Sequence, residues 1–125
     1  MSVRFFKCNH CGNVVEKVVD SGVPVVCCGE KMQELTVNTV DASVEKHLPV
    51  VTHVDDCHIK VEVGSVAHPM TEEHYIEWVC METELGVQYA HLDPNDAPKA
   101  KFSVCDGDKV LAVYAFCNQH NLWRK

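Results

Sequence analysis

The sequence has no cluster of basic residues. Its 11 Lys and Arg are outnumbered by 18 Asp and Glu, which leaves a formal net charge of −7 at pH 7. Nucleic-acid binding requires Lys and Arg gathered where they can contact phosphates. Because no basic stripe is present, we expect no nucleic-acid partner.

Long apolar runs are also missing. The longest, Val110–Cys117, suits a buried strand and is far shorter than the ~20 residues that a membrane-spanning helix needs. Before the first cysteine the only apolar core is the pair Phe5-Phe6, so no signal-peptide core is present. We therefore expect a soluble, cytoplasmic protein with no membrane partner.

Helical periodicity, internal repeats and low-complexity segments are absent as well. Instead, apolar and polar residues alternate in residues 58–63 and 101–105, which is the pattern of half-buried strands. Turn signals fall between such runs at residues 63–65, 93–96 and 106–108. This spacing predicts a mainly β fold, an antiparallel sandwich or barrel.

Cysteine and histidine, by contrast, are abundant, with eight of each. In a reducing cytosol such a density indicates metal binding or catalysis rather than disulfides. Four of the cysteines fall in residues 1–36, and a unit below ~40 residues usually needs a metal, disulfides or oligomerisation to fold. We expect two domains, residues 1–36 and 37–125, with residues 37–41 as the connection.

The cysteines of the first domain form a Cys-x2-Cys pair and, fifteen residues later, an adjacent pair: Cys8, Cys11, Cys27 and Cys28. Two such pairs can close on one ion as a tetrahedral S4 site, which usually holds zinc or iron. The adjacent pair leaves little backbone between two ligands, so we expect a strained site. A structural zinc site stays open as an alternative, and a vicinal disulfide is the weaker one.

A second set of ligand types is spread over the second domain. Cys117 ends the most apolar predicted strand, and His120 lies three residues on, within reach of the same ion. His68 and His74 flank a proline-containing loop, and His47 precedes a Leu-Pro pair. A soft thiolate together with imidazoles predicts a transition metal that takes part in chemistry.

Three other interpretations explain less. A 2-His-1-carboxylate site built from His68, His74 and Glu77 would leave Cys117 and His120 idle. A cupin-type oxygenase would normally show a His-x-His pair followed by Glu, which this chain lacks. A non-catalytic iron electron-transfer protein would account for the cysteines of the first domain and leave the histidines unexplained.

Taken together, the motifs resemble desulfoferrodoxin, the two-iron superoxide reductase family. The matching segments are Cys8-x2-Cys11-x15-Cys27-Cys28, Glu45-Lys46-His47-Leu48-Pro49, Gly64-Ser65-Val66-Ala67-His68-Pro69-Met70, His74-Tyr75-Ile76-Glu77-Trp78 and Cys117-Asn118-x-His120. They cover nearly the whole chain in the family's order, and all nine ligand positions hold the expected residue type.

The resemblance implies a desulforedoxin-like first domain, in which the four cysteines hold a rubredoxin-like iron. It implies an immunoglobulin-like antiparallel β-sandwich for the second domain, with a second non-haem iron. The equatorial ligands of that iron would be His47, His68, His74 and His120, and Cys117 would be the axial ligand, with one position open. Members of the family are typically homodimers that receive electrons from a small rubredoxin-like donor.

The implied activity is the one-electron reduction of superoxide to hydrogen peroxide without dismutation, in defence against oxidative stress. Because the chain is acidic, capture of an anion needs a local positive field, and Lys46 beside His47 is the predicted source. The resemblance suggests that Glu45 occupies the vacant position after turnover.

Several cysteines and histidines fall outside the motifs. We expect Cys80 and Cys105, at the ends of predicted strands, to be buried small apolar residues. Cys57 lies in an acidic stretch and is a candidate for an exposed, redox-active thiol. The remaining histidines are expected to be ordinary surface or turn residues: His10, His53, His58 and His91.

Overall fold

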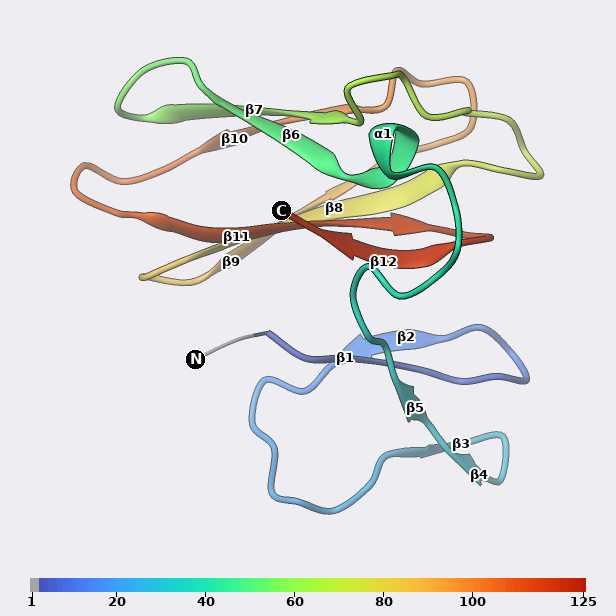
Figure 1. Ribbon diagram of the computed structural model, residues 1–125. Helices are drawn as coiled ribbons and strands as arrows, with labels where there is room; N and C mark the ends of the chain where they lie inside the picture. Colours follow the sequence, from blue (N-terminus) through green and yellow to red (C-terminus); the bar gives the residue numbers. More distant parts are fainter. Residues whose placement is uncertain (1–2) are drawn as a thin grey trace. The chain divides into compact units, whose positions relative to one another are not determined.

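The computed structural model describes residues 3–125 and divides the chain into two compact units, residues 1–36 (the N-terminal unit) and 37–125 (the C-terminal unit). Figure 1 labels their elements. The N-terminal unit contains β1 (Phe5–Lys7), β2 (Val14–Glu16), β3 (Val26–Cys27), β4 (Glu30–Lys31) and β5 (Gln33–Glu34). The C-terminal unit contains α1 (Val44–His47), β6 (Pro49–His53), β7 (His58–Val63), β8 (Ile76–Thr83), β9 (Val87–His91), β10 (Lys99–Ser103), β11 (Val110–Cys117) and β12 (Asn121–Arg124).

The C-terminal unit is a two-layered antiparallel sandwich. One sheet has the strand order β10-β7-β6 and the other β12-β11-β8-β9, and Figure 1 shows them as two facing layers with α1 beside the start of β6. The core consists of apolar side chains from both sheets, among them Ile59, Val61, Val79, Met81 and Val113. The predicted mainly β fold class is confirmed.

Alternation along the strands explains which side chains form this core. In β7, Ile59, Val61 and Val63 are buried, whereas the polar residues between them are not. The bounds of β7 and β11 agree with the alternating segment 58–63 and with the apolar run 110–117. Strand β10 begins at Lys99, two residues before the alternating segment that predicts it.

The expectation that Cys105 is buried is wrong. Strand β10 ends at Ser103, and the even-numbered residues Phe102 and Val104 face the core. Cys105 follows the odd-numbered positions of this strand and is exposed. Cys80, in contrast, is fully buried within β8, as expected.

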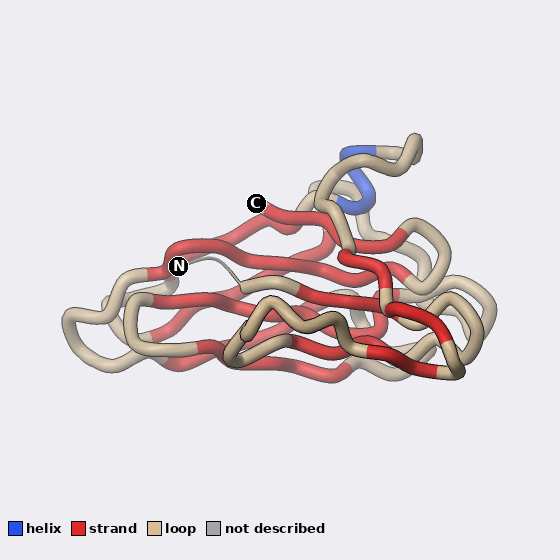
Figure 2. The backbone as a smooth tube through the Cα atoms, turned by 90° about the horizontal axis from the view of Figure 1, so that it is seen from below, coloured by secondary structure: helices blue, strands red, loops and turns tan. Residues whose placement is uncertain are grey.

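The N-terminal unit has strands of only two or three residues, arranged as β2-β1-β5 and β3-β4. Its buried apolar cluster is formed by Phe6, Cys8 and Met32, with Val15, Val25 and Cys27 packed against it. Figure 2 shows the described chain as strands and loops with a single helical turn, α1. A cluster of this size is small for a stable core, so we expect the four cysteines to contribute much of the stability of this unit.

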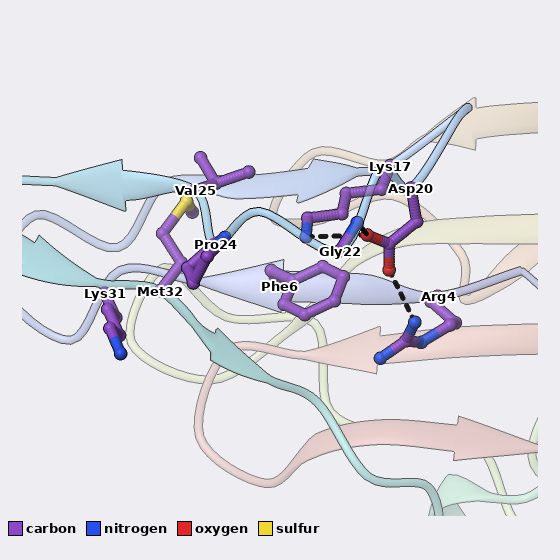
Figure 3. A pocket seen from close by; sticks show the side chains of 9 residues that line it. All are labelled: Arg4, Phe6, Lys17, Asp20, Gly22, Pro24, Val25, Lys31 and Met32. Atoms are coloured by element: carbon purple, nitrogen blue, oxygen red, sulfur yellow. Dashed lines mark hydrogen bonds and ion pairs between the residues drawn. The ribbon is translucent and has the colours of Figure 1, made fainter.

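A cleft of about 370 Å³ opens beside this cluster, between Phe6, Met32 and the loop that contains Asp20 (Figure 3). Arg4 and Lys17 lie over the Phe6 ring, 5.3 and 4.8 Å from its centroid. Their charges are already compensated, because the carboxylate of Asp20 accepts hydrogen bonds from Arg4 Nη1 at 2.6 Å and from Lys17 Nζ at 3.2 Å.

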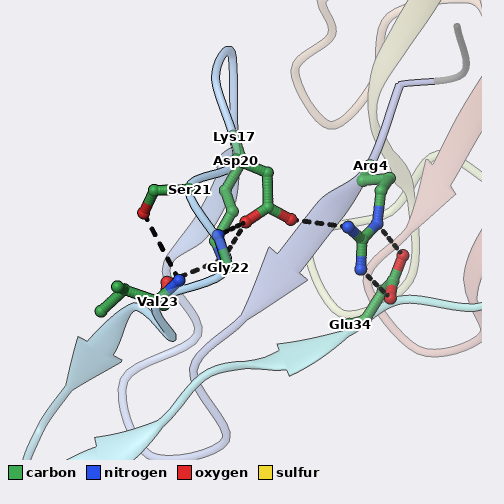
Figure 4. Close-up of polar contacts among 7 residues, drawn as sticks. All are labelled: Arg4, Lys17, Asp20, Ser21, Gly22, Val23 and Glu34. Atoms are coloured by element: carbon green, nitrogen blue, oxygen red, sulfur yellow. Dashed lines mark hydrogen bonds and ion pairs between the residues drawn. The ribbon is translucent and has the colours of Figure 1, made fainter.

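A second carboxylate completes this network, as Figure 4 shows. Glu34 accepts two hydrogen bonds from the Arg4 guanidinium, both at 2.8 Å. Asp20 also accepts the backbone N–H of Gly22 at 2.8 Å. The network ties the loop after β2 to β5, on the other side of β1.

The C-terminal unit is fastened at its start. Asn38 donates from Nδ2 to the carbonyl of Arg124 at 3.1 Å and accepts the Arg124 N–H at 2.9 Å. Its own N–H donates to the carbonyl of Leu122 at 3.1 Å. The segment predicted as a connection is therefore hydrogen-bonded to β12 at this residue. None of the helical segments among residues 3–125 has the length and hydropathy required to cross a lipid bilayer.

Candidate metal centres

The sulfur atoms of the N-terminal unit converge. Cys8, Cys11, Cys27 and Cys28, called here the four-cysteine group, place their Sγ atoms within 4.8 Å of one another, and all four thiols are free. Cys11 Sγ lies 3.6 Å from Cys27 Sγ, far beyond a disulfide bond of ~2.05 Å. Two sulfurs bound at ~2.3 Å to one tetrahedral ion would lie about 3.8 Å apart.

Neighbouring thiols in this group influence each other's ionisation. Backbone N–H groups of Cys11 and His10 lower the pKa of Cys8 to about 6. Hydrogen bonding from Cys11 and then Cys8 raises the pKa of Cys28 to about 12, and Cys11 likewise raises that of Cys27. Four thiolates at this distance repel one another, so the group requires a cation to be fully deprotonated.

The adjacent pair is accommodated by the backbone. Cys28 has φ +52° and Gly29 has φ +72°, and a left-handed backbone is unfavourable for a residue with a Cβ. The strain expected from adjacent ligands thus falls on Cys28. Two of the sulfurs belong to exposed residues, Cys11 and Cys28, whereas Cys8 is buried.

A second set of ligand types meets in the C-terminal unit. The ligand atoms of His47, His68, His74 and Cys117 lie within 4.8 Å of one another. Nδ1 of His120 joins them, 3.0 Å from His47 Nε2 and 3.9 Å from Cys117 Sγ. These five residues are called the His/Cys group below.

The four imidazole rings form a square. Centroid distances along its sides are 4.6 Å (His47–His68), 4.7 Å (His68–His74), 5.1 Å (His74–His120) and 4.9 Å (His120–His47). The distance across it, from His47 to His74, is 6.4 Å. Neighbouring ring planes are inclined by 79–82°. Four nitrogens in such an arrangement can face one central point.

Two of these rings have a fixed tautomer. His47 Nδ1 lies 2.7 Å from the carbonyl oxygen of Ser43, and His68 Nδ1 lies 2.7 Å from that of Pro69. A carbonyl oxygen only accepts, so both Nδ1 atoms carry a proton, and in the neutral imidazoles both Nε2 atoms carry a lone pair. The outer hydrogen bond of a metal-bound histidine serves the same purpose.

The two lone pairs then face each other. His68 Nε2 and His47 Nε2 are 3.2 Å apart, a contact that no hydrogen bond can explain when both nitrogens are acceptors. Protonation is disfavoured, because burial lowers the pKa of His68 to about 4 and also lowers that of His47. A metal cation satisfies both atoms, since nitrogens bound at right angles at ~2.1 Å would lie about 3.0 Å apart.

His74 and Cys117 lead to the same conclusion. His74 Nε2 is buried and has no hydrogen-bond partner among the described residues, and burial lowers the pKa of this imidazole. Burial raises the pKa of the Cys117 thiol, although the backbone N–H groups of Gln119 and His120 oppose this. His120 N lies 3.4 Å from the sulfur. The imidazoles are thus neutral, as a metal ion requires, and the charge of such an ion would offset the cost of ionising the buried Cys117 thiol.

The segments that carry these ligands are held by close backbone contacts. His47 ends α1, and this turn packs on the loop before His68. A Cβ on Gly64 would lie 2.5 Å from the carbonyl oxygen of Glu45, so only glycine permits this approach. The same carbonyl accepts the N–H of Val66 at 2.9 Å.

The indole of Trp123 supports two ligands. It is stacked on the His47 ring, with a centroid distance of 4.9 Å and an interplanar angle of 29°. Its Nε1–H donates to the carbonyl of His120 at 3.0 Å. Trp123 and Gly64 both lie outside the predicted site residues. In the sequence, Gly64 could have been identified by its residue type, and Trp123 by its position three residues after His120.

The residues predicted to act on the substrate lie beside this group. Glu45 is exposed, and Lys46 is half-buried. Burial is the largest cause that lowers the pKa of His47 and His74. The positive charge of Lys46 is the smallest cause given and lowers both pKa values further, so the ammonium acts on both rings. Of the residues outside the motifs, Cys57 is half-buried. The four remaining histidines are exposed, as expected: His10, His53, His58 and His91.

Comparison with known proteins agrees with this geometry. Residues 39–125 match the family described as desulfoferrodoxin, and residues 2–35 match the desulfoferrodoxin N-terminal domain. The chain belongs to the desulfoferrodoxin family. The four-cysteine group and the His/Cys group match the two irons of this family, so the predicted cofactors are confirmed.

Individual relatives cover almost the whole chain. Desulfoferrodoxin from Syntrophotalea carbinolica is 45% identical over 121 residues, which is 97% of this chain and 94% of the relative. The crystal structure of the superoxide reductase from Treponema pallidum has a TM-score of 0.84 and 42% identity, with 100% and 99% of the two chains covered. A one-iron superoxide reductase from Giardia intestinalis matches 65% of this chain and 95% of its own, with a TM-score of 0.55 and 30% identity.

Proposed function

We propose that the protein is a superoxide reductase that reduces superoxide to hydrogen peroxide by one electron without dismutation. The observation that carries this proposal is the pair of acceptor nitrogens on the buried His47 and His68, 3.2 Å apart in a square of four imidazoles with a buried thiol beside it. The superoxide reductases of similar structure support the assignment of the substrate.

The arrangement supports one set of ligands. We propose that His47, His68, His74, His120 and Cys117 would hold the catalytic iron. Ferrous iron held there would supply the single electron that superoxide needs to reach the peroxide level. The four-cysteine group would hold the second iron, Fe(Cys)4, in a domain of residues 1–36, and residues 37–125 would form the catalytic domain.

Lys46 would attract the anionic substrate. The chain carries a net charge of −7, so its overall field repels superoxide, and a local cation is needed to raise the rate of encounter. The ammonium of Lys46 already acts on the rings of His47 and His74. It is therefore close enough to attract an anion to the same rings.

Glu45 would limit access between turnovers. Its backbone carbonyl is fixed by Val66 N–H and by Ser65 Oγ at 3.3 Å. Its side chain is exposed, and its carboxylate accepts no hydrogen bond from the described residues. A carboxylate tethered two residues before His47 can approach the open position and exclude other ligands.

The setting of the reaction belongs to the same proposal. We infer a cytoplasmic homodimer that receives electrons from a rubredoxin-like donor and acts in defence against oxidative stress. The alternative, a non-catalytic iron electron-transfer protein, would need only the four-cysteine group. The His/Cys group favours catalysis, because it combines soft and imidazole ligands at one point.

Replacement of the thiolate tests this function. Cys117→Ser in the iron-loaded protein should abolish superoxide reduction and the sulfur-to-iron absorption of the C-terminal unit, while the absorption of the four-cysteine iron remains. Cys105→Ser, which changes an exposed thiol outside both groups, is the matched control. Superoxide turnover retained by the Cys117 variant, measured by pulse radiolysis, would contradict the proposed role of the thiolate.

A further inference from the structure

The His/Cys group is assembled from separate segments, and one of its rings lacks the anchor that two others have. His47 and His68 donate from Nδ1 to backbone carbonyls. No hydrogen bond holds the His74 ring among residues 3–125. The position of His74 must therefore be set through its backbone.

Three side chains hold that backbone. Thr71 Oγ1 contacts the N–H and carbonyl of His74 itself, and Gln119 reaches the carbonyl of Glu73. Among residues 3–125, the amide of Asn118 is the side chain that bonds the chain on both sides of His74. Its Oδ1 accepts the N–H of Tyr75 at 3.0 Å, and its Nδ2 donates to the carbonyl of Glu73 at 3.0 Å. Tyr75 and Glu73 are the two residues that flank His74. The amide thus uses both its acceptor and a donor to bind the chain on each side of the same ligand.

Asn118 also belongs to the turn that supplies the other ligands. It lies between Cys117 and His120, and its own N–H donates to the carbonyl of Tyr75 at 3.2 Å. The pairing of β11 with β8 is irregular at this point, where Cys117 pairs with Ile76 after a register shift. The regular ladder does not extend past this pair, so the Asn118 contacts continue the connection as far as Glu73.

We propose that Asn118 is a positioning residue for the His/Cys group, whose amide locks the backbone on both sides of His74 to the turn that carries Cys117 and His120. The inference rests on the proposed iron site. Loss of this amide would let His74 move relative to Cys117, and loss of such supporting residues typically lowers metal affinity 10–100-fold.

Two variants separate positioning from simple stabilisation. Gln119 donates from Nε2 to the same carbonyl of Glu73 at 2.7 Å, and within residues 3–125 its side chain has no hydrogen bond to Tyr75. Gln119→Ala thus weakens one side only. Asn38 makes an equivalent two-sided contact with the N–H and carbonyl of Arg124, so Asn38→Ala removes the same kind of hydrogen bonds in the same unit, away from His74.

The experiment measures iron affinity by equilibrium competition with a chelator, read from the sulfur-to-iron absorption that the His/Cys group retains. The absorption of the four-cysteine iron serves as an internal reference in each sample. We expect Asn118→Ala to weaken iron binding about 10–100-fold and to shift the absorption maximum. We expect Asn38→Ala to lower the melting temperature and to leave the iron affinity and the absorption maximum unchanged. The iron affinity of Gln119→Ala should lie between those of the parent and Asn118→Ala.

Equal iron affinity and an equal absorption maximum in Asn118→Ala and Asn38→Ala would overturn the inference. If Asn118→Ala does not fold, Asn118→Asp gives the same comparison, because it keeps the acceptor for Tyr75 and loses the donor to Glu73. A parent protein without the absorption of the His/Cys iron would instead contradict the proposed function, so the two failures are distinguishable.

Discussion

The two candidate metal centres depend on their surroundings in opposite ways. The four-cysteine group lies in a unit of very short strands, and half of its residues are exposed. The His/Cys group lies at one end of a sandwich with a continuous core, and His47 and His68 are only 3% exposed. In the first unit a bound ion would stabilise the fold. In the second unit the fold holds the ligands in place, which leaves the ion available for chemistry.

Removal of the metal should show this difference between the two units most strongly. A structural ion in a small domain contributes about 10–16 kcal/mol of binding free energy, so chelation should unfold the N-terminal unit and leave the sandwich folded. Hydrogen exchange of backbone amides, followed by residue, checks this. Protection of residues 3–36 that survives complete metal removal would show that their fold does not depend on the ion.

Truncation of the sandwich core should do the reverse. Phe102 is buried between the sheets, and Phe102→Ala should destabilise the C-terminal unit by about 3–5 kcal/mol. Iron in the four-cysteine group should remain bound. Leu85→Ala, at a side chain that is 73% exposed, is the control and should change the free energy of unfolding by less than about 0.5 kcal/mol. Similar losses in the two variants would rule out this description of the core.

Gly64→Ala should affect the His/Cys group alone. The added Cβ would lie 2.5 Å from the carbonyl of Glu45, so the turn that ends in His47 must shift, with an expected destabilisation of about 1–3 kcal/mol and weaker iron binding. Gly86→Ala meets nothing within 4 Å and provides the control. Titration with ferrous iron measures both variants, and equal affinities would argue against a close contact at Gly64.

Lys46→Ala should slow the capture of superoxide about 10-fold, at the lower end of the range for electrostatic steering. Its dependence on ionic strength should weaken, and the ferrous spectrum should not change. Pulse radiolysis at several salt concentrations measures this, with Lys109→Ala, at an exposed lysine just before β11, as the control. An unchanged second-order rate constant would show that Lys46 is not the source of the positive field that attracts superoxide.

The smallest effect concerns pH and the N-terminal unit. Hydrogen bonding from Arg4 lowers the pKa of Glu34, so this carboxylate stabilises the folded unit above its unfolded pKa of ~4.3. The contribution is lost as the pH falls through the lower folded pKa. Glu34→Gln should therefore lower stability at pH 7 by less than about 1 kcal/mol, and the difference from the parent should shrink in acid. A difference that grows as the pH falls, seen by denaturant titration, would contradict the assignment.

The sequence predicts the regular parts of this molecule well, because period-two alternation and burial have the same physical cause. Alternation in residues 58–63 and the apolar run 110–117 agree with β7 and β11. Cys105 could have been placed correctly by the same rule, since it shares the outward parity of Lys101 and Ser103.

Other features of the site depend on contacts between distant residues. The spacing and the family resemblance collect the ligand types, and the structure brings all five residues of the His/Cys group together. The tautomers of His47 and His68 are set by backbone carbonyls, which no residue type reveals. The contact between Gly64 and Glu45 joins segments that are 19 residues apart in the chain.

The stoichiometry of superoxide consumption tests the central claim most directly. The reduced, two-iron protein, supplied with an electron donor, should form one hydrogen peroxide for each superoxide consumed and release no oxygen beyond the background of spontaneous dismutation. Release of one oxygen for every two superoxide anions, with half the yield of peroxide, would identify a dismutase and contradict the account.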